Sequence, residues 1–174
     1  MSDARIGGCL QTRSGVRYYP LDPRWFEVLI EDISHSLSNI CRFNGHCNEF
    51  YSVAEHSVLV SQIVWPEHQL AALLHDAAEA YCCDIPTPLK RDLVGYAKIE
   101  AANWDAIAKR FKINPVLDVS VIKADRAVLL AEKAAIIDHH FDWELPGRPA
   151  RVEIQCLSPR RARDAFMARF KELT

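Results

Sequence analysis

The chain has 174 residues, and its 21 Lys and Arg against 23 Asp and Glu give a formal net charge of −2. A chain of this length suits one domain, 1–174, which can bury roughly 70% of the surface that the unfolded chain exposes. The lack of excess positive charge argues against binding to a nucleic-acid polymer through its phosphate backbone.

The first 28 residues are expected to form a hairpin and a lead-in to the helices. Two short β-capable runs flank a turn at Arg13–Gly15. Pro20 and Pro23 then delay the first helix, which is expected over 31–40.

Capping residues and prolines mark the later helices. Ser52 and Glu55 fit a capping box, in which the Glu55 side chain reaches back to the start of the helix. Ser158 and Pro159 fit the N-cap and first position of the last helix. The remaining expected segments are a loop over 41–50, helices over 53–65, 66–82, 89–111 with a break near Gly95, 118–139 and 158–173, a rigid proline connection over 84–88, and a loop over 142–157. This pattern predicts an all-α fold with a minor hairpin.

The chain shows no membrane or disulfide signature. No segment approaches the ~20 apolar residues that span a bilayer, and no apolar signal core is found at the N-terminus. Six cysteines occur without a C-x-x-C pair, so we interpret them as reduced thiols of a cytoplasmic protein. They could ligate zinc, although the paired spacing of structural zinc modules is missing.

The segment 70–81 (LAALLHDAAEAY) has two unlike faces. Its large apolar residues follow the i, i+3, i+4, i+7 spacing of one helix face. At ~100° per residue, His75, Asp76 and Glu79 fall on the opposite side, without the Lys, Arg or Gln of a solvated face. This second face is therefore expected to line a polar pocket.

Two further residues are predicted to join this face. The short connection at Pro66 makes the flanking helices antiparallel neighbours, so His56 could face His75. Asp125 lies in a largely apolar helix, where a carboxylate needs a partner or a metal. Two imidazoles and two carboxylates form a plausible site for a divalent cation such as Zn, Mn, Co, Fe or Ni, with His56, His75, Asp76 and Asp125 as ligands.

The ordered motifs resemble the HD-domain phosphohydrolase superfamily. They are SVAEHS at 52–57, HDAAE at 75–79, DIPTPLK at 84–90 and the isolated Asp125. The closer resemblance is to its small nucleotidase branch, which includes bacterial 5′-deoxynucleotidases and phage deoxynucleoside triphosphohydrolases. It covers about residues 30–135 and implies an HD-domain-like helical bundle as the catalytic core.

The resemblance also implies roles for individual residues. Glu79 would manage the proton of the attacking water, and Asp84 would lie beside the nucleophile or leaving group. Arg42 and Lys90 would contact phosphate, and Phe43, where the family has Trp, would contact the nucleoside. The extra histidine pair of two-metal members is missing, so the four ligands are expected to bind one metal ion.

The expected function is metal-dependent hydrolysis of (2′-deoxy)nucleoside 5′-phosphates by a 5′-nucleotidase. The resemblance suggests a homo-oligomer, and neither a nucleic-acid polymer nor a membrane is expected as a partner. A deoxynucleoside triphosphate triphosphohydrolase would use the same ligands. A non-catalytic sensor of nucleotide and metal, or a structural helical protein with a surface His-Asp pair, are the alternatives from other classes.

Several polar residues have weaker claims to function. His35 and His46 could contribute to the pocket or be structural. His139 and His140 are expected to offset a helix dipole, and Arg160–Arg163 to form a solvated helix face or an oligomer contact.

Overall fold

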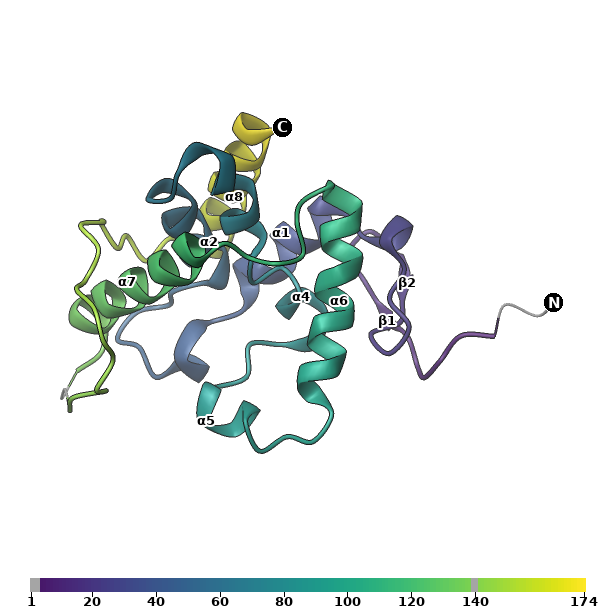
Figure 1. Ribbon diagram of the computed structural model, residues 1–174, viewed down its shortest axis with the longest axis horizontal. Coiled ribbons are helices and arrows are strands. Elements are labelled where there is room, and N and C mark those ends of the chain that lie inside the picture. The colour runs from purple at the N-terminus through teal and green to yellow at the C-terminus, as the bar shows by residue number, and fades with distance from the viewer. Residues whose placement is uncertain (1–3, 139–140) are drawn as a thin grey trace.

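The computed structural model describes residues 4–138 and 141–174, which form a mainly helical fold with a two-stranded sheet near the N-terminus (Figure 1). The expectation of an all-α fold with a small hairpin is confirmed. Within the described residues, no helix combines the length and the apolar composition needed to cross a bilayer. The elements in chain order are β1 (Leu10–Gln11), β2 (Arg17–Tyr18), η1 (Trp25–Glu27), α1 (Ile30–Asn39), η2 (Arg42–Gly45), α2 (Val53–Gln62), η3 (Pro66–His68), α3 (Gln69–Leu74), α4 (Glu79–Cys82), α5 (Thr87–Lys90), α6 (Tyr96–Phe111), α7 (Val119–Ile136) and α8 (Pro159–Leu173).

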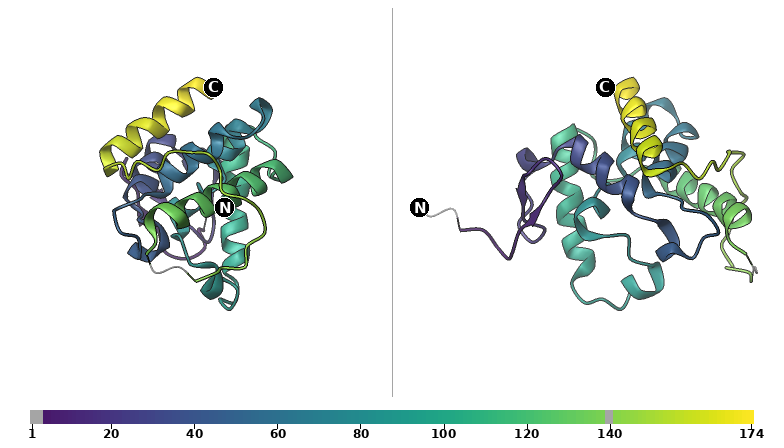
Figure 2. Two further views of the ribbon diagram at one scale, coloured as in Figure 1. Left: turned by 90° about the vertical axis from the view of Figure 1, so that its left-hand side faces the viewer. Right: turned by 180° about the vertical axis from the view of Figure 1, so that it is seen from behind.

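The hairpin lies at one end of the molecule, and α7 lies at the other (Figures 1 and 2). Strands β1 and β2 are antiparallel, with Leu10 opposite Tyr18. The Tyr18 ring is buried and stacks on Tyr81, with 3.7 Å between ring centroids, and its hydroxyl donates to Asn103 Oδ1 of α6 at 2.8 Å. One aromatic residue therefore ties the hairpin to α4 and α6.

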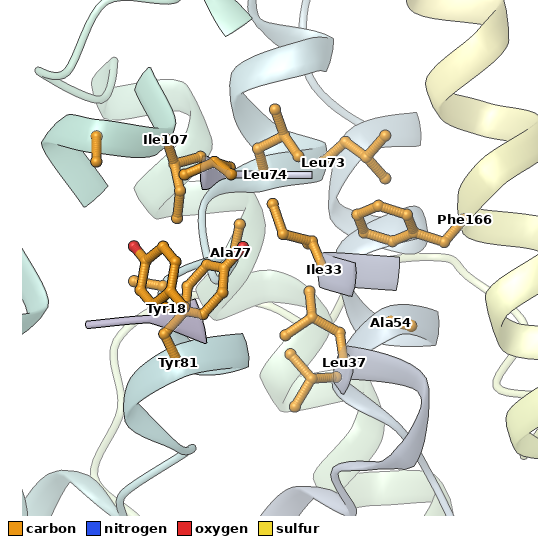
Figure 3. Close-up of a cluster of buried hydrophobic side chains, with 14 of the residues drawn as sticks. Tyr18, Ile33, Leu37, Ala54, Leu73, Leu74, Ala77, Tyr81, Ile107 and Phe166 are labelled. Carbon is orange, nitrogen blue, oxygen red and sulfur yellow. The ribbon is translucent and has the colours of Figure 1, made fainter. Parts of the chain in front are cut away.

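Two apolar clusters hold the helices together. In the first, Ile33 and Leu37 of α1, Leu73 and Leu74 of α3, and Phe166 of α8 are fully buried (Figure 3). Each such side chain contributes about 1.5–3 kcal/mol through burial.

The second cluster joins α2, α3 and α7. Leu59 and Val60 pack with Ala72, Val121 and Val128. Because α2 and α3 contribute to both clusters, the segments that carry the predicted ligands are fixed on either side by apolar packing.

The helix expected over 66–82 is divided into η3, α3 and α4, which corrects that prediction. Between α3 and α4, the Ala77 N–H donates to Leu74 O and the Glu79 N–H to Asp76 O, a tighter i to i−3 pattern. The Ala72 carbonyl, which would accept from the Asp76 N–H in a regular α-helix, is 2.8 Å from the His75 ring nitrogen Nδ1. The His75 side chain thus competes with the helical ladder at the break.

Only half of the predicted capping box forms. Ser52 Oγ accepts from the Glu55 N–H at 3.2 Å. The Glu55 carboxylate does not reach back, because it accepts from the backbone N–H groups of Gln155, Cys156 and Leu157 at 2.6–3.1 Å. The loop before α8 is therefore anchored to α2 by one buried carboxylate.

Other helix ends differ by a few residues from those expected. Helix α2 ends at Gln62 rather than near 65, and a separate turn, α5, precedes the predicted break at Gly95, whose φ is +86°. The Asp118 side chain caps α7 by accepting from the Ser120 N–H at 2.7 Å, whereas the Ser158 side chain makes no capping bond to α8.

Candidate metal centre and adjoining pocket

His56 lies in the first turn of α2, and its ring is completely buried. Its Nδ1–H donates to Glu132 Oε1 of α7 at 2.6 Å, because an ionised carboxylate can only accept. The opposite nitrogen, Nε2, makes no hydrogen bond with the described residues and lies 3.1 Å from Asp125 Oδ1. In the neutral ring this bond fixes the tautomer that leaves the Nε2 lone pair available. Burial and Arg42 lower the pKa of His56, but Glu132 and Asp125 outweigh them and raise it to about 9 without a metal, so a metal ion would bind Nε2 in place of a proton.

His75 is oriented in the same way at the break after α3. Its Nδ1–H donates to the Ala72 carbonyl, which fixes the tautomer of the neutral ring that has its lone pair on Nε2. This buried nitrogen makes no hydrogen bond within the described part of the chain. It lies 3.2 Å from Asp76 Oδ2 and 4.0 Å from Asp125 Oδ1.

The predicted ligands converge at one point between α2, α3 and α7. One ligand atom from each of His56, His75 and Asp125 lies within 4.8 Å of the other two, and Asp76 is not part of this tight group. Asp76 Oδ2 lies 3.6 Å from His56 Nε2 and 3.2 Å from His75 Nε2. Two buried nitrogens that make no hydrogen bond with the residues described, beside two carboxylates, fit the donor set of a divalent cation. The structure brings the four side chains together, and their role as ligands stays a prediction.

Glu132 was not singled out from the sequence, yet it organises the centre. Its carboxylate is fully buried and also accepts from the Tyr51 hydroxyl at 2.8 Å and from Arg42 Nη2 at 3.1 Å. Burial raises the pKa of this carboxyl, but Arg42 and His56 outweigh it and lower the pKa to about 2. The sequence feature that could have indicated Glu132 is its position seven residues after Asp125, which puts both carboxylates on the same face of a largely apolar helix.

Arg42 connects this carboxylate to the site. Its guanidinium is largely buried, bonded to Glu132 and 3.8 Å from Asp76 Oδ2. The next residue, Phe43, has a φ of +55°, a left-handed conformation that is uncommon for a bulky residue. Such backbone strain occurs preferentially at functional sites.

A cavity of about 760 Å³ opens beside these residues. This volume is within the range of small-molecule sites. It holds the remaining predicted site residues, Glu79, Asp84 and Lys90, together with loop 141–145. The described lining comprises Arg42, Phe43, Asn44, Asp76, Glu79, Asp84, Ile85, Pro86, Thr87, Pro88, Lys90, Arg91, Asp125, Leu129, Phe141, Asp142, Trp143, Glu144 and Leu145.

The two further carboxylates in the pocket are electrostatically crowded. Glu79 is buried, with Oε2 lacking a hydrogen bond to any described residue. Burial first, and then the charges of Asp76 and Asp84, raise the pKa of Glu79 well above 4.5. Burial and Asp76 likewise raise the pKa of Asp84. Lys90 lies in the same pocket and forms an ion pair with Glu100 at 2.5 Å.

The weaker candidates lie elsewhere. His35 lines a separate cavity with Arg13 and Arg163, and His46 is exposed at the end of η2. His139 and His140 lie outside the described residues. The described cysteines are free thiols, and none belongs to the cluster that could hold a metal.

No family model matches the chain. It is 41% identical over 169 residues to "Uncharacterized protein YfdR" of Escherichia coli (strain K12), with 95% of each chain covered. It is 34% identical over 177 residues to "Uncharacterized protein RCAP_rcc00048" of Rhodobacter capsulatus, with 90% of each chain covered. The chain therefore belongs to the family of the Escherichia coli protein YfdR.

Proposed function

We propose that this protein is a metal-dependent phosphohydrolase of the HD-domain type that hydrolyses (2′-deoxy)nucleoside 5′-monophosphates. The observation that carries the proposal is the pair of buried Nε2 atoms, on His56 and His75, aimed at Asp76 and Asp125 beside the pocket. Both rings have Nδ1 engaged, so each ring in its neutral form directs its Nε2 lone pair to the same point.

The donor set suits one ion of Zn, Mn, Co, Fe or Ni. When bound by these four residues, such an ion polarises a phosphoryl oxygen and lowers the pKa of bound water. The other roles fall to the chain's own groups in the pocket. Glu79 takes the proton of the attacking water, and its raised pKa suits a group that must both accept and release a proton. Asp84 receives the proton next or passes it to the leaving group.

The cations of the pocket favour a short phosphate chain. Among the described lining residues, only Arg42, Lys90 and Arg91 are cationic, and Arg42 and Lys90 already pair with Glu132 and Glu100. Six carboxylates line the same space: Asp76, Glu79, Asp84, Asp125, Asp142 and Glu144. A monophosphate needs fewer positive partners than a triphosphate, so this balance favours a nucleotidase over a triphosphohydrolase.

A sensor that binds nucleotide and metal without turnover is the alternative from another class. It needs no acid or base beside the ligands. The buried Glu79 carboxylate, with one oxygen unpartnered among the described residues, would then only destabilise the protein. This residue therefore supports the catalytic reading.

The deciding experiment is a panel of dAMP, AMP, dATP and a nucleoside, each assayed with Mn²⁺, Co²⁺ and Zn²⁺. We expect inorganic phosphate from the monophosphates and no triphosphate from dATP. His75→Ala should abolish release, whereas His46→Ala, at an exposed position, should not. Triphosphate release from dATP would favour the second enzyme, and nucleotide binding without any phosphate product would favour the sensor.

A further inference from the structure

We infer that Trp143 binds the base of the nucleotide and so makes the enzyme selective for phosphate esters that carry a planar ring. The inference rests on the proposed function for the phosphate end of the ligand. At the other end, loop 141–145 supplies the half-buried Trp143 ring to the same cavity. The ring lies 6.1 Å from the Phe43 ring, between centroids, at an angle of 48°.

Helix α7 runs from the ionic end of the pocket, at Asp125, to the aromatic end, near Lys133. Asp125, Leu129 and Lys133 succeed one another at four-residue intervals and share one face of α7. The Lys133 ammonium lies 4.9 Å from the Trp143 ring centroid and donates to the Phe141 carbonyl at 2.6 Å. Trp143 is thus held near Lys133. Along the axis of α7, Lys133 lies about 12 Å from Asp125.

The wall between these ends is apolar. Leu129 of α7 lines the cavity between the level of Asp125 and that of Lys133, and Phe43 follows directly on Arg42. A ligand that fills this space has a phosphate near Asp125 and Arg42, and a flat apolar ring near Trp143. Every nucleobase has such a π-face, so several different bases can stack on this wall. A sugar phosphate has no planar ring and gains no stacking energy here.

The two ends of the cavity hold different groups. Asp142 and Glu144 line the cavity beside Trp143, where Lys133 is the cation near the ring. The opposite end holds Arg42, Lys90 and the candidate metal ligands, whose carboxylates a bound metal ion would neutralise. The phosphate is therefore placed at the metal end and the base beside Trp143.

The test compares Trp143→Leu with Trp65→Leu, a matched change at a Trp that is 70% exposed. Binding of dAMP is measured by calorimetry with Mn²⁺ in a Glu79→Ala background, which removes turnover. We expect Trp143→Leu to raise the Kd for dAMP about tenfold, within the range for stacking on one aromatic ring. Trp65→Leu should leave this Kd unchanged.

A second measurement uses the catalytically intact chain. The ratio of kcat/KM for dAMP to that for deoxyribose 5-phosphate should fall about tenfold in Trp143→Leu, with Trp143→Phe in between. An unchanged Kd for dAMP, or an equal loss for both substrates, would overturn the role of Trp143. If no phosphate is released but dAMP binding still depends on Trp143, the hydrolase proposal fails and the base site stands.

Discussion

The Glu132 carboxylate fixes the His56 ring, with Oε1 2.6 Å from Nδ1. A carboxylate behind a histidine sets its tautomer and strengthens the opposite nitrogen as a metal ligand. Glu132 also bonds Arg42 and Tyr51, so one buried group orients a candidate ligand and a candidate phosphate contact together.

The first prediction concerns the hydrogen bond by which Glu132 orients the His56 ring. Glu132→Gln should lower the affinity for Mn²⁺ or Co²⁺ by about 10- to 100-fold, the usual effect of losing such a partner. Calorimetric metal titration checks this, with the exposed Glu67→Gln as control. An affinity equal to that of the wild type would mean that Glu132 acts only in packing.

The second prediction concerns acid stability of the metal-free protein. Folding lowers the pKa of Glu132 from 4.5 to about 2. A lowered pKa stabilises the folded state above pH 4.5, and this contribution is lost as pH falls from 4.5 toward 2. The shift corresponds to about 3 kcal/mol. Urea unfolding between pH 6 and pH 3 should show a steeper loss in the wild type than in Glu132→Gln. Parallel pH profiles for the two proteins would refute the assignment.

The sequence was enough to find the residues that converge at the candidate centre. His75, Asp76 and Glu79 were detectable because a helix face without Lys or Arg is unusual for solvent. Asp125 was detectable because a carboxylate in a largely apolar helix needs a partner or a metal, although its side chain is 41% exposed rather than buried. The same argument applies to Glu132, two turns later on α7, whose role follows from burial.

Other features depend on contacts that sequence periodicity does not encode. Apolar spacing predicts a continuous helix over 66–82, but the local hydrogen bond between the His75 side chain and the Ala72 carbonyl competes with the backbone, and the helix α3 ends at Leu74. Trp143 lies in a loop whose sequence has no hydrophobic periodicity, and its ring comes close to that of Phe43 only in the folded chain. Glu55 satisfied the capping pattern locally, yet its carboxylate is taken by the loop before α8.

The third prediction is that the Glu55 carboxylate, which anchors the loop before α8, stabilises the fold without affecting the metal centre. Glu55→Gln removes the charge that accepts three backbone N–H groups, and its single amide oxygen cannot replace both carboxylate oxygens. We expect a loss of about 1.5–3 kcal/mol in the free energy of unfolding. Urea denaturation measures it, with Glu153→Gln in the same loop as the exposed control. Metal affinity should be unchanged, and a loss of metal in Glu55→Gln would contradict the separation.

The fourth prediction tests Asp76 as a ligand. Its Oδ2 lies within 3.6 Å of both candidate nitrogens, so Asp76→Ala should leave the protein without tightly held metal. Metal content after dialysis against a trace of Mn²⁺ gives the answer. Asp105→Ala, on the exposed face of α6, is the matched control. If Asp76→Ala retained a full equivalent of metal, the centre would consist of His56, His75 and Asp125 without it.

The last prediction concerns the proton of the attacking water. Glu79→Gln should keep the metal and the nucleotide but lower kcat by about 10²- to 10⁴-fold. Burial, with Asp76 and Asp84, raises the pKa of Glu79 above 4.5, so the wild-type carboxyl becomes a base only as pH rises through that higher value. The wild-type rate should therefore increase with pH over a range above 4.5, and this acid limb should vanish in Glu79→Gln. Asp84→Asn is the comparison: it removes a carboxylate that raises the pKa of Glu79, so its remaining activity should keep an acid limb that is shifted to lower pH. A normal limb in Glu79→Gln would transfer the role of base to another group of the pocket.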